Sequence, residues 1–173
     1  NSGQLDLPAG AGESLETVMI PDGERRTVCI SSQVGCGMGC VFCASGLFGL
    51  KRQLSAGEIV EQVLHMRRAM HEGERVSHLV FMGMGEPLGN YSSLERSIRI
   101  FNADWGCGIG RRHMTVSTVG MLGQAKKLAR DHPQVTLAIS LHAPNDDIRR
   151  KIVPTAKKVT VDDLIEGARE YFR

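Results

Sequence analysis

The feature that most constrains the fold is a regular alternation of short apolar runs with amphipathic helical patterns. Four apolar runs are typical of strands: Thr27–Ser31, His78–Met82, His113–Ser117 and Val135–Ser140. A helical pattern follows each of them, over residues 55–70, 92–101, 120–131 and 161–171, with a short helical turn at 145–151. Successive strands joined by helical crossovers lie parallel in one sheet. The alternation therefore predicts an α/β fold with a parallel sheet.

Serine residues mark two of the expected helix starts. Ser55 and Glu58 have the spacing of a capping box, in which each side chain bonds the backbone N–H of the other residue. Ser92 or Ser93 is the expected cap of the next helix.

The N-terminal part predicts a β-hairpin ahead of the parallel sheet. Residues 15–20 read as a strand, and the turn signal Pro21-Asp22-Gly23 separates them from the run that begins at Thr27. Residues 1–14 contain glycine, serine and proline and predict a frayed segment. By length, residues 15–173 predict one core domain.

Composition narrows the class of protein. Hydrophobic residues make up 42% of the chain and charged residues 23%, as in ordinary globular proteins. No apolar run approaches the roughly 20 residues of a membrane span, and no signal-peptide pattern is present. Five cysteines, three of them clustered, fit a metal site in a reducing compartment better than a disulfide framework. We therefore expect a cytoplasmic protein with no membrane partner.

Positive charge is concentrated in short basic clusters, although the net charge is only +2. Each cluster alone is typical of a solvated surface, whereas several along one rim would form a phosphate-binding surface. The clusters are Arg25-Arg26, Lys51-Arg52, Arg67-Arg68, Arg111-Arg112, Arg149-Arg150-Lys151 and Lys157-Lys158.

A loop with three cysteines carries the strongest chemical signal. Cys36, Cys40 and Cys43 lie in a glycine-rich run directly after the predicted hairpin. Thiolates are soft, charged ligands, and glycines let the backbone fold closely around a metal centre. Closed structural sites use four ligands, so three ligands leave one metal position open for chemistry. A structural zinc site completed by a residue elsewhere, or cysteines that merely pack in a core, remain alternatives at this point.

Polar and glycine-rich segments follow each predicted parallel strand. They are the cysteine loop and the segments 83–87, 117–120 and 140–144. The carboxyl ends of parallel strands share one edge, and in barrel-like α/β folds that edge carries the chemistry. We expect these segments to meet there. A doubly wound sheet is the alternative fold, although no segment indicates a reversal of strand order.

Several motifs in order resemble the RlmN/Cfr family of radical-SAM RNA methyltransferases. They are Cys29-Ile30-Ser31-Ser32-Gln33-Val34-Gly35-Cys36, Phe81-Met82-Gly83-Met84-Gly85-Glu86-Pro87 and Ser140-Leu141-His142-Ala143-Pro144-Asn145-Asp146, together with the CxxxCxxC spacing of the cysteines. The resemblance extends from about Glu16 to the last residue. It implies a partial TIM-like radical-SAM barrel with about four of the family's six strand–helix units. Gly-Glu-Pro favours the RlmN branch, which methylates carbon 2 of an adenine. Segments 49–52 and 132–135 look more like the Cfr branch, which methylates carbon 8.

The resemblance also implies roles for single residues. Cys36, Cys40 and Cys43 match the ligands of a [4Fe–4S] cluster. Residues that match contacts to S-adenosylmethionine are Gly85, Glu86, Ser117, Ser140, Leu141 and His142. Glu16 matches a proposed proton acceptor, and Cys29 matches a cysteine that helps to resolve the protein–RNA adduct.

Each of these residues also has a purely structural interpretation. Glu16 could be a surface carboxylate, Cys29 a small core residue and Glu86 a turn residue before a proline. His142 could be a satisfied loop histidine, and the two serines could bond only backbone. Cys107 matches nothing in the family and is expected to be a free thiol.

The family implies a two-part mechanism and a set of partners. Reductive cleavage of S-adenosylmethionine gives a radical, and a methylated cysteine then delivers its carbon to the adenine. The substrate is expected to be RNA and not DNA, namely 23S rRNA with tRNA as a further candidate, and an electron donor such as flavodoxin is needed. The methyl-carrying cysteine of the family lies downstream of Arg173, so we expect this chain alone not to complete methyl transfer. A radical-SAM enzyme with another substrate and a non-enzymatic zinc module remain as alternative functions.

Overall fold

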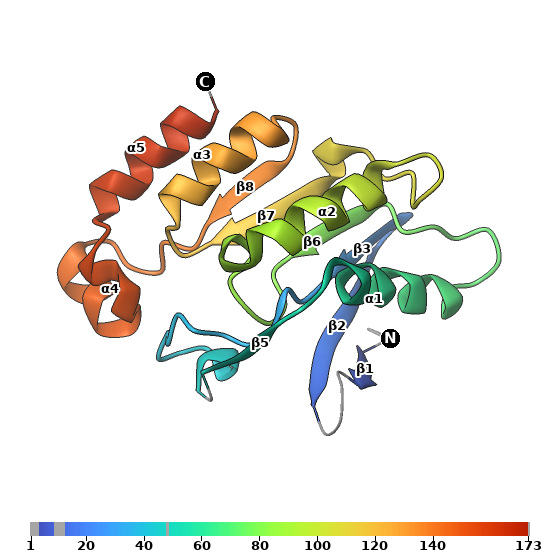
Figure 1. Ribbon diagram of the computed structural model, residues 1–173, viewed down its shortest axis with the longest axis horizontal. Helices are drawn as coiled ribbons and strands as arrows, with labels where there is room; N and C mark the ends of the chain where they lie inside the picture. The colour runs from blue at the N-terminus through green and yellow to red at the C-terminus, as the bar shows by residue number, and fades with distance from the viewer. Residues whose placement is uncertain (1–3, 9–12, 48, 173) are drawn as a thin grey trace.

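The computed structural model describes residues 4–8, 13–47 and 49–172 of the chain. A six-stranded sheet forms its centre, with the strands in the order β1-β2-β3-β6-β7-β8 (Figure 1). The strands are β1 Gln4–Pro8, β2 Ser14–Asp22, β3 Arg25–Cys29, β6 His78–Phe81, β7 Met114–Thr118 and β8 Thr136–Ile139.

The sheet divides into an antiparallel and a parallel part. Strands β2 and β3 form the predicted hairpin, and β1 adds antiparallel to the far side of β2. Strands β3, β6, β7 and β8 are parallel, as the alternation of strands and helices predicted. The carboxyl ends of four strands therefore lie at one edge of the sheet.

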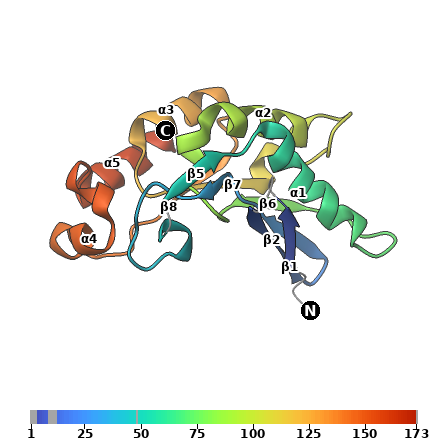
Figure 2. The same ribbon diagram turned by 60° about the horizontal axis from the view of Figure 1, so that its bottom comes forward.

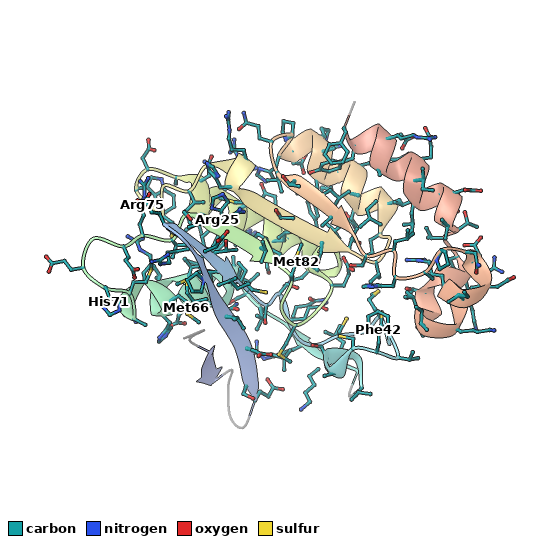
Figure 3. The ribbon with its side chains drawn as sticks, turned by 180° about the vertical axis from the view of Figure 1, so that it is seen from behind. Arg25, Phe42, Met66, His71, Arg75 and Met82 are labelled. Atoms are coloured by element: carbon teal, nitrogen blue, oxygen red, sulfur yellow. The ribbon has the colours of Figure 1, made fainter. Side chains whose placement is uncertain are left out.

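All the long helices lie on one face of this sheet, as Figure 2 shows. They are α1 Ala56–Arg68, α2 Tyr91–Asn102, α3 Leu122–Asp131 and α5 Val161–Tyr171. The core fills the space between them and the sheet, with fully buried Val28, Phe81 and Val116 from the strands against Ile59 and Leu94 from the helices. The opposite face carries no helix in the described part of the chain (Figure 3).

One-sided coverage decides between the two predicted architectures. A doubly wound sheet has helices on both faces, whereas a TIM-like barrel has helices only outside its strands. The arrangement is that of a partial TIM-like barrel, so the predicted fold class is confirmed. The helix-free face corresponds to the inside of such a barrel.

The strands of the structure differ from the prediction in two respects. Gln4–Pro8 lie in the segment that was expected to be frayed, yet they form β1 and pair with β2 from Gln4↔Val18 to Pro8↔Ser14. The backbone N–H and C=O groups of β1 find hydrogen-bond partners in β2, although the sequence of β1 lacks a strand pattern. A second, two-stranded sheet, β4 Gln33–Gly35 with β5 Leu50–Gln53, was not predicted because its strands are very short.

Helix starts agree with the sequence only where local chemistry controls them. The capping box of Ser55 and Glu58 is present at the start of α1. Helix α2 begins at Tyr91, after the 3-10 turn η2 Pro87–Asn90, so the predicted cap at Ser92 or Ser93 was wrong. The Glu86 carboxylate caps η2 through the Leu88 N–H, and Pro87 is the first residue of η2, so the helical run begins ahead of the serines. Among the described residues, no helix has both the length and the apolar character needed to cross a membrane.

We predict that the capping box contributes stability that depends on pH. The Arg52 guanidinium, with the Ser55 N–H and hydroxyl, lowers the pKa of Glu58 below its ordinary 4.5. A carboxyl with a lowered pKa stabilises the fold above its unfolded pKa, and this contribution is lost as pH falls through the folded value. Glu58→Gln should lower the free energy of unfolding near pH 7 by about 1 kcal/mol.

Chemical unfolding at several pH values measures this effect. The difference between Glu58→Gln and the native chain should shrink as pH falls below about 4.5. Glu61→Gln on the same helix is the matched control, because its side chain is 61% exposed and it has only a 3.6 Å contact with His65. A Glu58→Gln effect that stays constant down to pH 3 would contradict the assignment.

Candidate functional site

The cysteine loop is held at its two ends by the β4–β5 pair. Gly35, the last residue of β4, has φ +74°, and the Cys36 N–H donates to the Gly49 carbonyl at 3.1 Å. A Cβ at Gly35 would lie 2.1 Å from the same Gly49 oxygen, which is a severe clash. Only glycine fits both the backbone conformation and the close approach. The loop therefore closes on itself because residue 35 has no side chain.

The three cysteines of this loop are free thiols that influence one another. Cys36 and Cys40 are buried, and Cys43 is half-buried. Burial raises the pKa of Cys36 and of Cys40, and each also experiences repulsion from Cys43. The Met38 N–H donates to the sulfur of Cys36, which opposes the shift. Three thiols that would repel as thiolates are suited to a positively charged metal centre, which would favour their deprotonation.

The cysteine loop rests on the segment that follows β8. The Val41 N–H donates to the Ile152 carbonyl at 3.0 Å, and Cys40 packs against fully buried Val153. The rings of Phe42 and His142 lie 4.5 Å apart between centroids. Ile152 ends helix α4 Asp146–Ile152, which lies beyond the carboxyl ends of the strands (Figure 1). The predicted metal and cofactor segments are therefore neighbours.

The loop after β6 is built against the backbone between β3 and β4. The Ser31 hydroxyl accepts from the Met84 N–H at 2.9 Å and donates to the Glu16 carbonyl at 2.7 Å. The Gln33 side chain accepts from the Glu86 N–H at 2.8 Å. Gly85 has φ +100°, and a Cβ there would lie 2.5 Å from the Gln33 side chain. The glycine thus permits the contact that fixes the loop.

The Glu86 carboxylate joins two of the loops at this edge. It is 3% exposed and accepts from the Val119 N–H at 2.9 Å and from the Leu88 N–H at 3.2 Å. Burial raises the pKa of Glu86, while these hydrogen bonds oppose the rise. The Leu88 contact caps η2 and explains why the helical run starts before Tyr91. Glu86 therefore holds the end of β7 against the loop after β6.

The side chain of Arg149 is buried at the carboxyl-end edge of the sheet. The sequence placed it in a basic run typical of a solvated surface, yet its side chain is fully buried, so that interpretation was wrong for this residue. The guanidinium donates to the carbonyls of Leu141 at 3.1 Å, Val159 at 3.4 Å and Val119 at 2.5 Å. Burial lowers its pKa, and Asp146 and Cys40 oppose that shift. One side chain thus connects the loops after β7 and β8.

Glu16 and Cys29 lie on the helix-free face. Val18 pairs with Cys29 across the β2–β3 hairpin, and Glu16 is two residues from Val18, so the three share a face. Burial raises the pKa of Cys29, and the Glu16 carboxylate adds to the rise, whereas the Met82 N–H opposes it. The structure therefore brings these two predicted residues together.

The pocket beside Glu16 reaches the cysteine loop. It measures about 310 Å³ and is lined by Glu16, Gly35, Ser45, Lys51 and Met84, among others. Glu16 itself is exposed. The carboxylate, the cysteine loop and the loop after β6 consequently face one space.

The remaining predicted residues occupy the ends of β7 and β8. Ser117 donates to the Phe81 carbonyl at 2.9 Å, and the Ser140 N–H donates to the Thr118 carbonyl at 2.8 Å. Leu141 is 37% exposed, and His142 is exposed with φ +60°. His142 is the one non-glycine residue with positive φ in the described part of the chain, and such strained backbone is concentrated at functional sites. All eleven predicted site residues lie near the carboxyl-end edge or on the face next to it.

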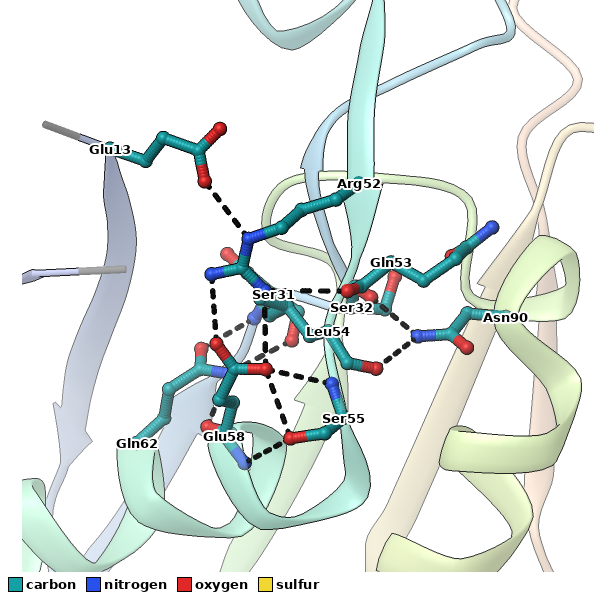
Figure 4. Close-up of polar contacts among 10 residues, drawn as sticks. All are labelled: Glu13, Ser31, Ser32, Arg52, Gln53, Leu54, Ser55, Glu58, Gln62 and Asn90. Carbon is teal, nitrogen blue, oxygen red and sulfur yellow. Dashed lines mark hydrogen bonds and ion pairs between the residues drawn. The ribbon is translucent and has the colours of Figure 1, made fainter. Parts of the chain in front are cut away.

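A network of polar side chains connects the β4–β5 pair to the neighbouring elements (Figure 4). Arg52 pairs with Glu13 at 2.9 Å and with Glu58 at 2.8 Å. The Asn90 amide donates to the carbonyls of Ser32 at 2.8 Å and Leu54 at 2.7 Å. The contacts link the cysteine-bearing hairpin to α1 through Glu58 and to the residue that precedes α2, Asn90.

The three cysteines supply sulfur donors, the ligand type that iron–sulfur clusters use. Within residues 13–47 and 49–172, no three histidine, cysteine or carboxylate side chains are arranged to hold one metal ion, and this includes the loop cysteines. The three cysteines nevertheless share one loop, with a backbone N–H directed at a sulfur, as in iron–sulfur sites.

Comparison with known proteins decides the family. The sequence model of the Radical SAM superfamily matches residues 30–173. The chain belongs to this superfamily. The match begins before the cysteine loop and includes every predicted cofactor segment. A radical-SAM methyltransferase from Sphaerobacter thermophilus has the same fold, with a TM-score of 0.87 and 42% identity, covering 98% of this chain and 54% of that chain.

Curated relatives of this radical-SAM chain are RNA methyltransferases by name. Ribosomal RNA large subunit methyltransferase N of Nitrosopumilus maritimus is 46% identical, covering 98% of this chain and 51% of the relative. The probable dual-specificity RNA methyltransferase RlmN of Gloeobacter violaceus is 53% identical, covering 95% and 47% respectively. The chain therefore spans about half the length of the curated relatives that it matches.

Several residues that build the site carry no signal in the sequence. Arg149 stands in a basic run, and Gln33 and Asn90 look like loop polar residues until their distant partners are known. Gln33 bonds a residue 53 positions away, Asn90 one 58 positions away and Arg149 one 30 positions away. Local patterns do not report such contacts, which depend on the finished fold.

We predict that Arg149 stabilises the chain through its three carbonyl contacts. Arg149→Met should lower the free energy of unfolding by about 3 kcal/mol. The substitution leaves three carbonyls without a hydrogen-bond donor, and this destabilises the fold by more than the removal of a buried charge stabilises it. Chemical unfolding measures the loss. Hydrogen exchange should show faster opening at residues 119–121 and 141–145.

Arg150→Met is the control for this substitution. Arg150 is 45% exposed, with ion-pair contacts of 3.7 Å to Asp146 and Asp147, so its loss should change stability by about 0.5 kcal/mol or less. Equal effects at positions 149 and 150 would contradict the role given to the buried guanidinium.

Proposed function

We propose that the chain is the core of a radical-SAM RNA methyltransferase of the RlmN type. The observation that carries this proposal is the meeting of the cysteine loop with the loops after β6 and β8 at the carboxyl-end edge. Residues 15–173 would then form an incomplete radical-SAM core domain. The names of the relatives support RNA as the substrate class.

The three cysteines are proposed to hold a [4Fe–4S] cluster. Cys36, Cys40 and Cys43 would each bind one iron and leave the fourth iron open. A bound cluster supplies the electron for reductive cleavage of S-adenosylmethionine. The Met38 N–H would donate to a ligand sulfur, and the contact of Cys40 with Val153 would exclude water from one side.

The cofactor is proposed to lie along the loops that follow β6, β7 and β8. Gly85 and Glu86 would meet its ammonium group, with the carboxylate holding the shape of the segment through Val119 and Leu88 while it retains free acceptor positions. Ser117, Ser140, Leu141 and His142 would contact the rest of the cofactor. The position of these residues at one edge of the sheet, with the His142 ring 4.5 Å from that of Phe42 between centroids, supports this assignment.

Glu16 and Cys29 are proposed to act on the RNA base. They share the helix-free face, and Glu16 opens on the pocket of about 310 Å³ beside the cysteine loop. Glu16 would accept a proton from the adenine carbon, and Cys29 would help to release the product. The raised pKa of Cys29 would keep it a thiol until a base or an adduct approaches.

The proposed target is carbon 2 of an adenine in 23S rRNA, with tRNA as a further substrate. Gly85-Glu86-Pro87 and the RlmN names of the relatives favour this position over carbon 8. The reaction would need a one-electron donor such as flavodoxin. The five free cysteines fit a reducing compartment, and we propose a cytoplasmic location.

We predict that iron binding depends on the loop cysteines and not on thiols in general. After anaerobic reconstitution, the native chain should retain about four irons and four sulfides. Cys40→Ala should lose most of this iron, because two thiolates cannot hold the cluster. Cys107→Ala is the matched control and should bind iron like the native chain, since Cys107 lines a pocket at the opposite edge of the sheet.

The same samples test the chemistry. Reduced with dithionite and given S-adenosylmethionine, the native and Cys107→Ala chains should form 5′-deoxyadenosine, and Cys40→Ala should not. Zinc bound in place of iron, or equal iron in Cys40→Ala and Cys107→Ala, would overturn the proposed function.

A further inference from the structure

A larger pocket lies at the edge of the sheet opposite the cysteine loop. It measures about 580 Å³, the size of a small-molecule or nucleotide site. We call it the amino-end pocket, because it surrounds the first residues of β6 and β7. Its walls come from the end of α1, the segment before β6 and the glycine-rich loop after α2, with Arg67, Arg75, His78, Arg112 and His113 as its charged or titratable side chains.

The charge of this pocket is positive and uncompensated. Arg67, Arg75 and Arg112 form no ion pair and no side-chain hydrogen bond within the described residues, so all three guanidinium groups of the pocket lack a carboxylate partner there. No described lining residue is acidic. Arg25 lies near Arg75 at this end of the molecule, away from Phe42 and Met82 (Figure 3). Guanidinium groups without carboxylate partners are suited to phosphate oxygens.

Two histidines form part of the wall of the pocket. His113 Nδ1 and His78 Nε2 are 3.0 Å apart, and the rings meet edge to face with centroids 4.6 Å apart. The other nitrogen of His78, Nδ1, lies 3.0 Å from the Ser77 hydroxyl, so both nitrogens of that ring have partners. No third metal-binding side chain joins the two histidines within the described part of the chain.

An exposed tryptophan stands on the loop that lines the pocket. Trp105 is 81% exposed and is the single tryptophan of the chain. It lies two residues before Cys107, which lines the pocket together with Gly108 and Gly110. Aromatic side chains beside basic grooves bind single-stranded nucleic acids, because every base can stack on them. A large indole that is exposed on the same loop as the lining residues Cys107 and Gly108 is suited to stack with a base of a nucleotide ligand.

We propose that the amino-end pocket and Trp105 bind one nucleotide of a single-stranded RNA segment, with its phosphate among the arginines and its base on the indole. The inference rests on the proposed function, since it takes RNA as the substrate. Strand β6 separates this pocket from the cysteine loop by roughly 13 Å along the strand direction. The nucleotide bound here is therefore not the methylated one, and the pocket holds a neighbouring part of the substrate.

Fluorescence excited selectively at tryptophan tests the proposal directly, because Trp105 is the single tryptophan of the chain. Titration of the chain with a short single-stranded RNA should quench that emission and give a Kd that rises with salt. Arg75→Gln and Arg112→Gln should each weaken binding about tenfold. Trp105→Ala should weaken binding of a dye-labelled RNA about tenfold, and Trp105→Phe should restore most of it, because a smaller ring still stacks.

Arg96→Gln is the matched control. Arg96 is exposed on α2, has no ion pair in the described structure, and does not line the pocket, so its loss should leave the Kd unchanged. Equal affinities for the native chain, Arg75→Gln and Arg112→Gln, or unchanged Trp105 emission at saturating RNA, would overturn the proposal.

Two further measurements are needed. The first distinguishes RNA from a free nucleotide or phosphate as the ligand, and the second distinguishes failure of this proposal from failure of the proposed function. Inorganic phosphate and AMP should compete only at concentrations far above that of the RNA; competition at equal concentration would show a free-nucleotide site and overturn the RNA assignment. Formation of 5′-deoxyadenosine is measured on the same variants and should be unchanged. If the native chain cleaves S-adenosylmethionine but the pocket variants bind RNA with unchanged Kd, this proposal alone is refuted. If the native chain does not cleave S-adenosylmethionine although the pocket variants weaken RNA binding, the proposed function alone is refuted.

Discussion

The close contact between the loop after β6 and the backbone at Ser31–Gln33 is the constraint on which the site depends. Gly83 and Gly85 permit it, since a Cβ at either position would lie less than 3 Å from residues 30–33. The Ser31 hydroxyl then bonds both the Met84 N–H and the Glu16 carbonyl. The same contact places Gln33, the first residue of β4, beside the Glu86 N–H. Through this one junction the cysteine loop, the Gly85–Glu86 segment and Glu16 acquire fixed relative positions.

Two buried charged side chains dominate the electrostatics at the carboxyl-end edge of the sheet. The Glu86 carboxylate and the Arg149 guanidinium are both buried, and each uses backbone groups of the loops as partners. Both bind Val119, Glu86 through its N–H and Arg149 through its carbonyl. Burial of unpaired charge is costly, so these contacts oppose movement of the loops. Burial raises the pKa of the Cys36 and Cys40 thiols beside them, and a metal centre would counteract that rise.

The sequence predicted those parts of the fold that local patterns control. Apolar periodicity located β6, β7, β8 and α5, and the spacing of Ser55 and Glu58 located the start of α1. It failed for β4 and β5, whose three or four residues show no pattern, and for the start of α2, which follows the 3-10 turn that Glu86 caps through the Leu88 N–H. For the site, the sequence motifs identified the loops but not the buried polar residues whose hydrogen bonds hold these loops in position. The burial of Arg149 could not be predicted, because its three partners come from separate loops.

The two edges of the sheet have different chemistry, and the central claim concerns the carboxyl-end edge. Electron paramagnetic resonance of the reconstituted, reduced chain with and without S-adenosylmethionine tests that claim most directly. A [4Fe–4S] cluster held by three cysteines has an open iron, so addition of S-adenosylmethionine should change the spectrum. A cluster signal that S-adenosylmethionine leaves unchanged would contradict the account, because the open position and the cofactor loops would then not form one site.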